Sequence, residues 1–100
     1  MRALSVRQPY ADQITRGSNR IEYRSRPTKI RGRIYIYASL TPAFSEGEDL
    51  PRGVIVGTVE IFNCTGSPGD YRWHLRDPKP LARPRKPVVK PQPVWFNPFP

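Results

Sequence analysis

A charged stretch near the N-terminus carries the strongest chemical signal in this sequence. In "RIEYR", Arg20, Glu22 and Arg24 alternate with apolar and aromatic residues. Alternate side chains of a β-strand share one face, so this spacing places two guanidinium groups and a carboxylate side by side. An arginine can bind a phosphate or a base edge through paired hydrogen bonds, and a carboxylate can orient it or accept a base N–H. The alternative is a charge ladder on a solvated sheet face, worth a few tenths of a kcal/mol.

Four further residues are candidates for ligand binding. Arg7 leads into a predicted helix, where its charge can combine with free backbone N–H groups to hold an anion. Lys29 lies in the basic connection "RPTKIRG" and is expected to help hold a phosphate. Tyr71 and Trp73 follow a Gly-Asp turn among cationic residues, so we expect them to be exposed and to stack on bases. Core packing is the competing interpretation for every aromatic residue.

A catalytic use of these residues stays open. Glu60 lies on the polar side of a predicted central strand, and a buried carboxylate there needs a cation or a ligand amine. If the protein is an enzyme, Glu22, Glu60 and Lys29 are the acid–base candidates. Thr28 or Ser25 could then supply a hydroxyl group. One Cys and one His do not support a zinc site of the Cys/His type, and we expect no metal or other cofactor.

The elements that must position these residues are mostly predicted strands. Alternation of apolar and polar residues predicts strands at 3–8, 17–25, 33–39 and 54–64. A helix is predicted between the first two strands, with Pro9 at its first position and Gly17 just past its end. Residues 40–53 are expected to form a loop or short helix, and "YRWHLRD" a helix of two turns. The pattern predicts an α+β, mainly β fold, a small β-barrel with one or two short flanking helices.

Composition bounds the size of the protein and the class of its partners. The 100 residues are expected to form one domain, since so short a chain rarely supports two cores. From Pro78 to the end the sequence is proline-rich and basic, with enough apolar residues to predict packing on the barrel edge. The net charge of +9 favours polyanionic partners such as RNA, DNA or nucleotides, although solubility alone could explain it.

The cellular setting is expected to be the cytoplasm. The single cysteine, Cys64, cannot form an internal disulfide and fits a reducing compartment, so no disulfide-linked partner is expected. No apolar run is long enough to span a bilayer, and the first residues do not form a signal-peptide pattern. We therefore expect no membrane partner.

Several motifs together resemble the ASCH domain (activating signal cointegrator homology) of the PUA-like superfamily. They are "LSVRQPYADQI", "GSNRIEYRS", "PRGVIVGTVEIFNC" and "GDYRWHL", in the family's order. The resemblance implies a small PUA-like β-barrel flanked by helices, with a cleft beside the strand that follows the first helix. It also implies an RNA- or nucleotide-binding function, while some family members are reported to hydrolyse nucleic acid or acylated cytidine.

One position departs from the family signature, which can be written G-x-K-x-x-E-x-R. Gly17, Glu22 and Arg24 occupy the glycine, acid and final arginine, but Asn19 stands where the family has lysine. Asparagine can donate and accept hydrogen bonds but carries no charge and cannot act as a base. In a regular strand Arg20 points to the opposite face from Asn19, so it could replace the lysine only through a local bulge or a helical start to this segment. We therefore predict a module that binds RNA or a nucleotide. The alternatives are a small metal-independent hydrolase of acylated cytidine nucleosides or RNA, and a protein-interaction module.

Overall fold

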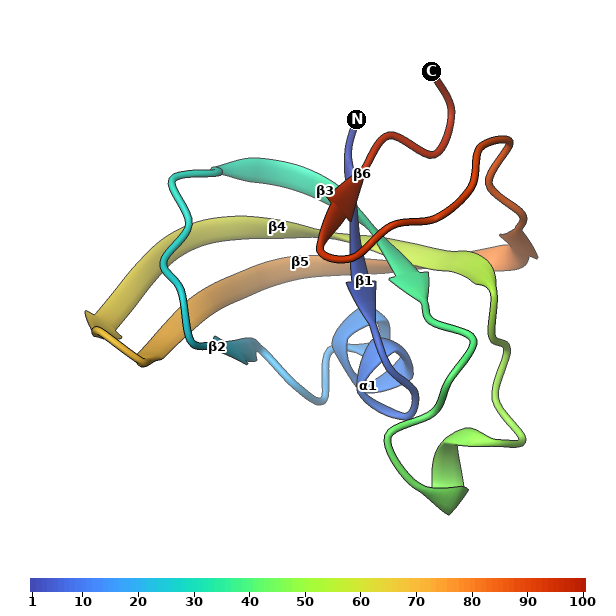
Figure 1. Cartoon of the computed structure of the whole chain (residues 1–100), viewed down its shortest axis with the longest axis horizontal. Coiled ribbons are helices and arrows are strands. Elements are labelled where there is room, and N and C mark those ends of the chain that lie inside the picture. The colour runs from blue at the N-terminus through green and yellow to red at the C-terminus, as the bar shows by residue number, and fades with distance from the viewer.

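The computed structural model describes residues 1–100 and is built on one curved, six-stranded mixed sheet (Figure 1). The strands lie in the order β2-β5-β4-β3-β1-β6, and β1 pairs with β3 in parallel. The mainly β fold with a short flanking helix is confirmed, but the sheet does not close into a complete barrel. The elements are β1 (Ala3–Val6), α1 (Tyr10–Arg16), β2 (Ile21–Arg24), β3 (Gly32–Ala38), the 3₁₀ turn η1 (Ser45–Gly47), β4 (Val54–Ser67), β5 (Asp70–Arg85) and β6 (Trp95–Phe96).

The long hairpin of β4 and β5 forms the centre of the sheet. Gly69 has φ 87°, a left-handed conformation that glycine adopts without steric penalty, and it allows the tight turn between the two strands. The predicted helix at 71–77 is wrong, because this segment is the first half of β5 and pairs with both β4 and β2. Trp73 and Leu75 are buried while their neighbours are not, which is the two-residue period of a strand.

The proline-rich part of the chain divides into two pieces. Residues 78–85 continue β5, where only β4 pairs with it, so the other edge of the strand is free and proline is tolerated. Beyond Arg85 the chain crosses the sheet and returns as β6 beside β1 (Figure 1). Val89, Phe96 and Phe99 pack in a cluster with Tyr37 on β3.

A separate and larger core lies between the sheet and α1. Its apolar side chains come from the helix and from strands β1, β3, β4 and β5, and include Leu4, Ile14, Ile34, Ile36, Ile61, Trp73 and Leu75. The helix ends at Gly17, whose φ of 83° is the left-handed cap common at this position. The chain has no helix with the length and hydropathy of a membrane span.

A buried glutamine fixes the start of the helix relative to the loop before β4. The Gln8 side chain accepts a hydrogen bond from the Asp12 backbone N–H at 2.9 Å and donates one to the Pro51 carbonyl at 2.8 Å. Gln8 is fully buried, so both bonds are shielded from water. The neighbouring Arg7 is thereby held at a defined position between β1 and α1.

Candidate ligand-binding cleft

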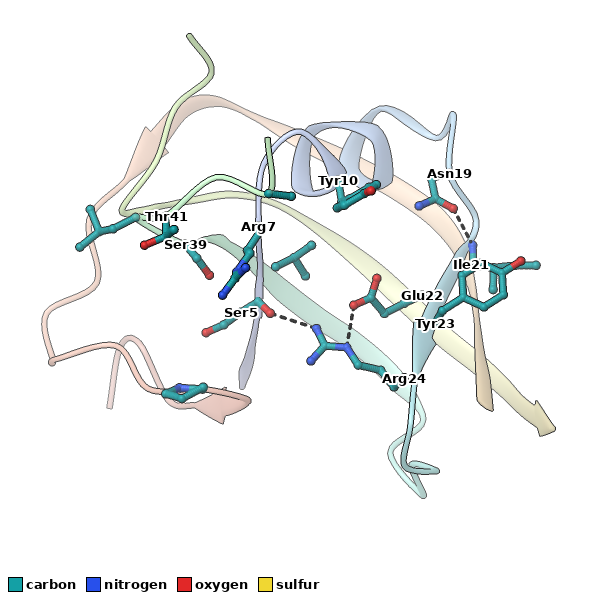
Figure 2. Close-up of a pocket in the computed structure, with 14 residues that line it drawn as sticks. Ser5, Arg7, Tyr10, Asn19, Ile21, Glu22, Tyr23, Arg24, Ser39 and Thr41 are labelled. Atoms are coloured by element: carbon teal, nitrogen blue, oxygen red, sulfur yellow. Dashed lines mark hydrogen bonds and ion pairs between the residues drawn. The ribbon is translucent and has the colours of Figure 1, made fainter. Parts of the chain in front are cut away.

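A cleft of about 830 Å³ lies between α1, β2 and the loop that follows β3 (Figure 2). Its walls combine charged, hydroxyl-bearing, aromatic and apolar side chains. The lining residues are Ser5, Val6, Arg7, Tyr10, Asn19, Ile21, Glu22, Tyr23, Arg24, Ser39, Leu40, Thr41, Ala43 and Pro93. The cleft therefore brings together four residues that the sequence singles out: Arg7, Asn19, Glu22 and Arg24.

Arg7 is the free cation of the cleft. Its side chain is exposed and lines the cleft from the segment that joins β1 to α1 (Figure 2). It forms no ion pair and no side-chain hydrogen bond, in contrast to Arg24 on the opposite wall. A guanidinium group in this state keeps all five N–H donors available for an anion.

Arg24 is largely occupied by partners within the protein. Its Nε lies 2.7 Å from Oε2 of Glu22, and its Nη2 donates to the Ser5 carbonyl at 3.0 Å. The guanidinium carbon also lies 5.5 Å from the ring centroid of Trp73, a distance typical of a cation–π contact. Strands β2 and β1 are not neighbours in the sheet, so Arg24 links them across its open side. These contacts indicate that the main role of Arg24 is to position the Glu22 carboxylate and to hold β2 against β1.

The Glu22 carboxyl group has an altered acidity. Burial raises its pKa, and the adjacent Arg24 guanidinium opposes this rise without cancelling it. The side chain is 13% exposed, and its second oxygen makes no hydrogen bond within the protein. The geometry therefore leaves one carboxylate oxygen at the cleft surface, able to accept a hydrogen bond or a proton.

Glu22 should make the free energy of unfolding depend on pH. Because its folded-state pKa is raised, the folded protein binds more protons than the unfolded chain just above the ordinary value of 4.5. Stability attributable to this group therefore falls as pH rises from 4.5 through the raised pKa. We expect Glu22→Gln to flatten this part of the stability profile, as measured by urea unfolding at a series of pH values. A profile identical to that of the wild type would contradict the assignment.

Asn19 contributes no charge to the cleft. Its Oδ1 accepts the backbone N–H of Ile21 at 3.2 Å, which stabilises the turn into β2 and leaves the amide nitrogen free (Figure 2). Arg20 is exposed but does not line the cleft, and its backbone carbonyl pairs with Leu75. The cleft thus lacks a cation where the family signature has lysine.

The remaining predicted site residues lie elsewhere. Lys29 lines a separate hollow, and Glu60 forms an ion pair with Arg76 at 2.8 Å on the β4–β5 hairpin. Tyr71 is half-buried and pairs across the strands with Arg24. Trp73 is not exposed as expected. The side chain is 3% exposed because its ring stacks on that of Trp95, with ring centroids 5.8 Å apart. Its Nε1 donates a hydrogen bond to the Arg26 carbonyl.

Several residues that line the cleft were not among the candidate site residues named from the sequence. Tyr10 is 41% exposed at the rim and meets Phe44 edge-on, with ring centroids 5.7 Å apart. Ser39 and Thr41 bring hydroxyl groups from the segment after β3. Tyr10 could have been found as an aromatic residue in the first helical turn beside Arg7, but Ser39 and Thr41 belong to no recognisable motif.

Comparisons with known proteins place this architecture in context. A family model described as the ASCH domain matches residues 4–85. The crystal structure of ASCH from Zymomonas mobilis has a TM-score of 0.72 at 17% identity, covering 95% of this chain and 85% of that chain. A tyrosine-to-phenylalanine mutant of that protein gives the same score and identity, covering 95% and 87%. No curated protein sequence matches the chain. At this level of identity the structural likeness supports the fold alone.

Proposed function

Because the chain belongs to the ASCH domain family, we propose that its cleft binds RNA or a nucleotide. The family is PUA-like, with proposed RNA-binding or hydrolase roles. The observation that carries the proposal is the unpaired guanidinium group of Arg7, which lines a cleft also lined by an exposed aromatic ring. The net charge of +9 adds long-range attraction for a polyanion.

Each wall of the cleft suits one part of a nucleotide. Arg7 would bind a phosphate group through charge-assisted hydrogen bonds. Tyr10 would stack on a base, and the free amide of Asn19 with the hydroxyl groups of Ser39 and Thr41 would contact base or sugar edges. Glu22 would accept an N–H of the base on its free oxygen, while Arg24 holds that carboxylate in place.

Tyr10 provides a direct test of the stacking step. Tyr10→Ala is expected to weaken binding of a fluorescently labelled oligouridylate by about 1–3 kcal/mol, the usual contribution of one base–aromatic stack. Tyr10→Phe keeps the ring and should bind within about twofold of the wild type. Fluorescence anisotropy titration at fixed salt measures both.

The matched control for Tyr10 is an exposed aromatic on another surface. Phe62 is 41% exposed on β4 and lies outside the cleft, so Phe62→Ala should leave affinity unchanged. Equal losses in Tyr10→Ala and Phe62→Ala would remove the support for base stacking at the cleft rim.

A metal-independent hydrolase is the second candidate, favoured by the raised pKa of Glu22. A desolvated carboxyl group with a raised pKa and an oxygen open to a cleft is a candidate for acid–base chemistry. The uncharged Asn19 argues against it, as does the fact that neither Lys29 nor Glu60 lines the cleft. Incubation with N-acylated cytidine and labelled RNA distinguishes the candidates, since turnover that Glu22→Gln abolishes would favour the hydrolase.

A further inference from the structure

A second basic hollow lies at the other end of β1 from the cleft. It measures about 380 Å³ and is formed by the N-terminal residues, the β2–β3 connection and the start of β3. No acidic side chain lines it, and its residues are Met1, Arg2, Lys29, Ile30, Arg31, Arg33 and Ile34. An adjacent hollow of about 420 Å³ shares Arg2 and adds Trp95, Phe96 and Asn97. Arg2 therefore joins two concave surfaces.

The arginines of this hollow are held in place without being neutralised. Arg31 donates from Nη1 to the carbonyls of Thr28 and Ile30, at 3.0 and 2.8 Å. Arg33 donates to the Thr58 hydroxyl at 2.8 Å, and the guanidinium carbon of Arg2 lies 6.0 Å from the Trp95 ring centroid. None of these cations belongs to an ion pair.

Glu60 is the acid that pairs with Arg33 across the strands, and the charge of Arg33 is one of the causes that lower its pKa. The carboxylate nevertheless forms its ion pair with Arg76, at 2.8 Å, and not with Arg33. Neutral partners fix the orientation of a guanidinium group and leave its full charge available to a ligand. A cluster of oriented, unpaired cations is the usual protein surface for phosphate groups.

Cationic residues follow one another along the chain segment that runs from the cleft to the hollow. The chain from Arg24 to Arg33 contributes five cationic side chains, and no acid occurs between Glu22 and Glu46. Arg26 is exposed between Arg24 in the cleft and Lys29 in the hollow. Arg2, just before β1, lines the hollow, and Ser5 on β1 lines the cleft. At 3.3 Å per residue of extended chain, these two residues lie about 10 Å apart. A strand of several nucleotides could place phosphate groups in both sites at once.

We propose that this hollow, together with Arg26, is a second phosphate-binding subsite for single-stranded nucleic acid whose other part lies in the cleft. The proposal rests on the function proposed above and narrows its ligand from a nucleotide to an oligonucleotide. Repeating phosphates along a strand match a line of cations, which favours a nucleic acid over a flat anionic membrane surface. Arg2, Lys29 and Arg31 supply the main contacts, and Arg24 and Arg26 lie on the path between the subsites.

The test removes three charges from the hollow while keeping hydrogen-bonding capacity. The variant carries Arg2→Gln, Lys29→Gln and Arg31→Gln. Its matched control carries Arg83→Gln, Lys86→Gln and Lys90→Gln. These exposed cations lie at the C-terminal end of β5 and in the segment after it, and none of them lines the hollow. Both are titrated with labelled oligouridylate of about 12 nucleotides, with uridine monophosphate and with vesicles rich in phosphatidylserine, after thermal melting has shown that they fold.

The salt dependence of oligonucleotide binding gives the decisive result. Each lost phosphate contact lowers the slope of log K against log[salt] by about 0.7 for a single strand, so the hollow variant should be shallower by about 2. Its affinity for the oligonucleotide at low salt should fall by at least about tenfold. Binding of uridine monophosphate should be unchanged, and the control should keep a slope close to that of the wild type.

The outcomes separate this proposal from the function of the cleft. Equal slopes in the hollow and control variants would overturn the second subsite, even if the cleft binds uridine monophosphate. Vesicle binding lost in the hollow variant, with oligonucleotide binding unchanged, would assign the hollow to a membrane surface and also overturn it. If uridine monophosphate does not bind the wild type but the oligonucleotide slope falls as expected, the hollow stands and the cleft proposal fails.

Discussion

Arg7→Gln is expected to reduce the affinity of the protein for RNA or nucleotide by about 10- to 100-fold. A hydrogen bond to a charged group contributes about 1.5–3 kcal/mol, and this variant removes the charge while keeping an amide donor. Arg7 has no partner within the protein, so its loss should leave the melting temperature nearly unchanged. Anisotropy titration and thermal melting together measure the two effects.

The control for Arg7 is a cation in the last turn of α1 that does not line the cleft. Arg16 is paired with Asp12 at 2.8 Å and is well exposed at the end of α1, so Arg16→Gln removes the same net charge. Arg16→Gln should lower the affinity only slightly, through the loss of one unit of overall positive charge. If the two variants lose affinity equally, the effect is long-range attraction and the cleft is not the binding site.

The contrast between Arg7 and Arg24 shows what the sequence could and could not reveal. The alternation of "RIEYR" correctly placed Glu22 and Arg24 on one face, since this depends only on strand geometry. It could not show that Arg24 would be occupied by the Ser5 carbonyl, because Ser5 lies on a strand at the other side of the sheet. We also expect Arg24→Ala to weaken binding, because the Glu22 carboxylate then loses the guanidinium group that positions it in the cleft.

Dependence on residues distant in the sequence also explains why the exposure of Trp73 was predicted wrongly. Trp73 follows a turn among cations, which suggested exposure, yet its burial depends on Trp95, a residue far along the chain. The helix predicted for the surrounding segment was wrong, since Tyr71, Trp73 and Leu75 recur at every second residue, as they do in a strand. Local periodicity indicated most strands, whereas partners brought together by the fold decided which side chains reach the cleft.

Arg24 links β2 to β1 across the open side of the sheet, and its removal should be strongly destabilising. Arg24→Ala leaves the Glu22 carboxylate buried without its cation, leaves the Ser5 carbonyl without its donor, and uncovers Trp73. Breaking a buried pair by removing one partner is strongly destabilising, so we expect a loss of about 2–4 kcal/mol in the free energy of unfolding. Urea denaturation at neutral pH measures it. Arg24→Lys keeps the charge but not the planar donor geometry and should lose less.

A double variant separates the orphaned charge from the other contacts of Arg24. In Arg24→Ala combined with Glu22→Gln, no carboxylate remains to be buried unpaired, so part of the lost stability should return. The deficit of Arg24→Ala alone should also shrink at acidic pH, because burial already raises the pKa of Glu22 and without the opposing guanidinium raises it further. A double variant as unstable as the sum of the single ones would show that Arg24 acts through Ser5 and Trp73 alone. The Glu22–Arg24 pair would then belong to the binding cleft without stabilising the link between β2 and β1.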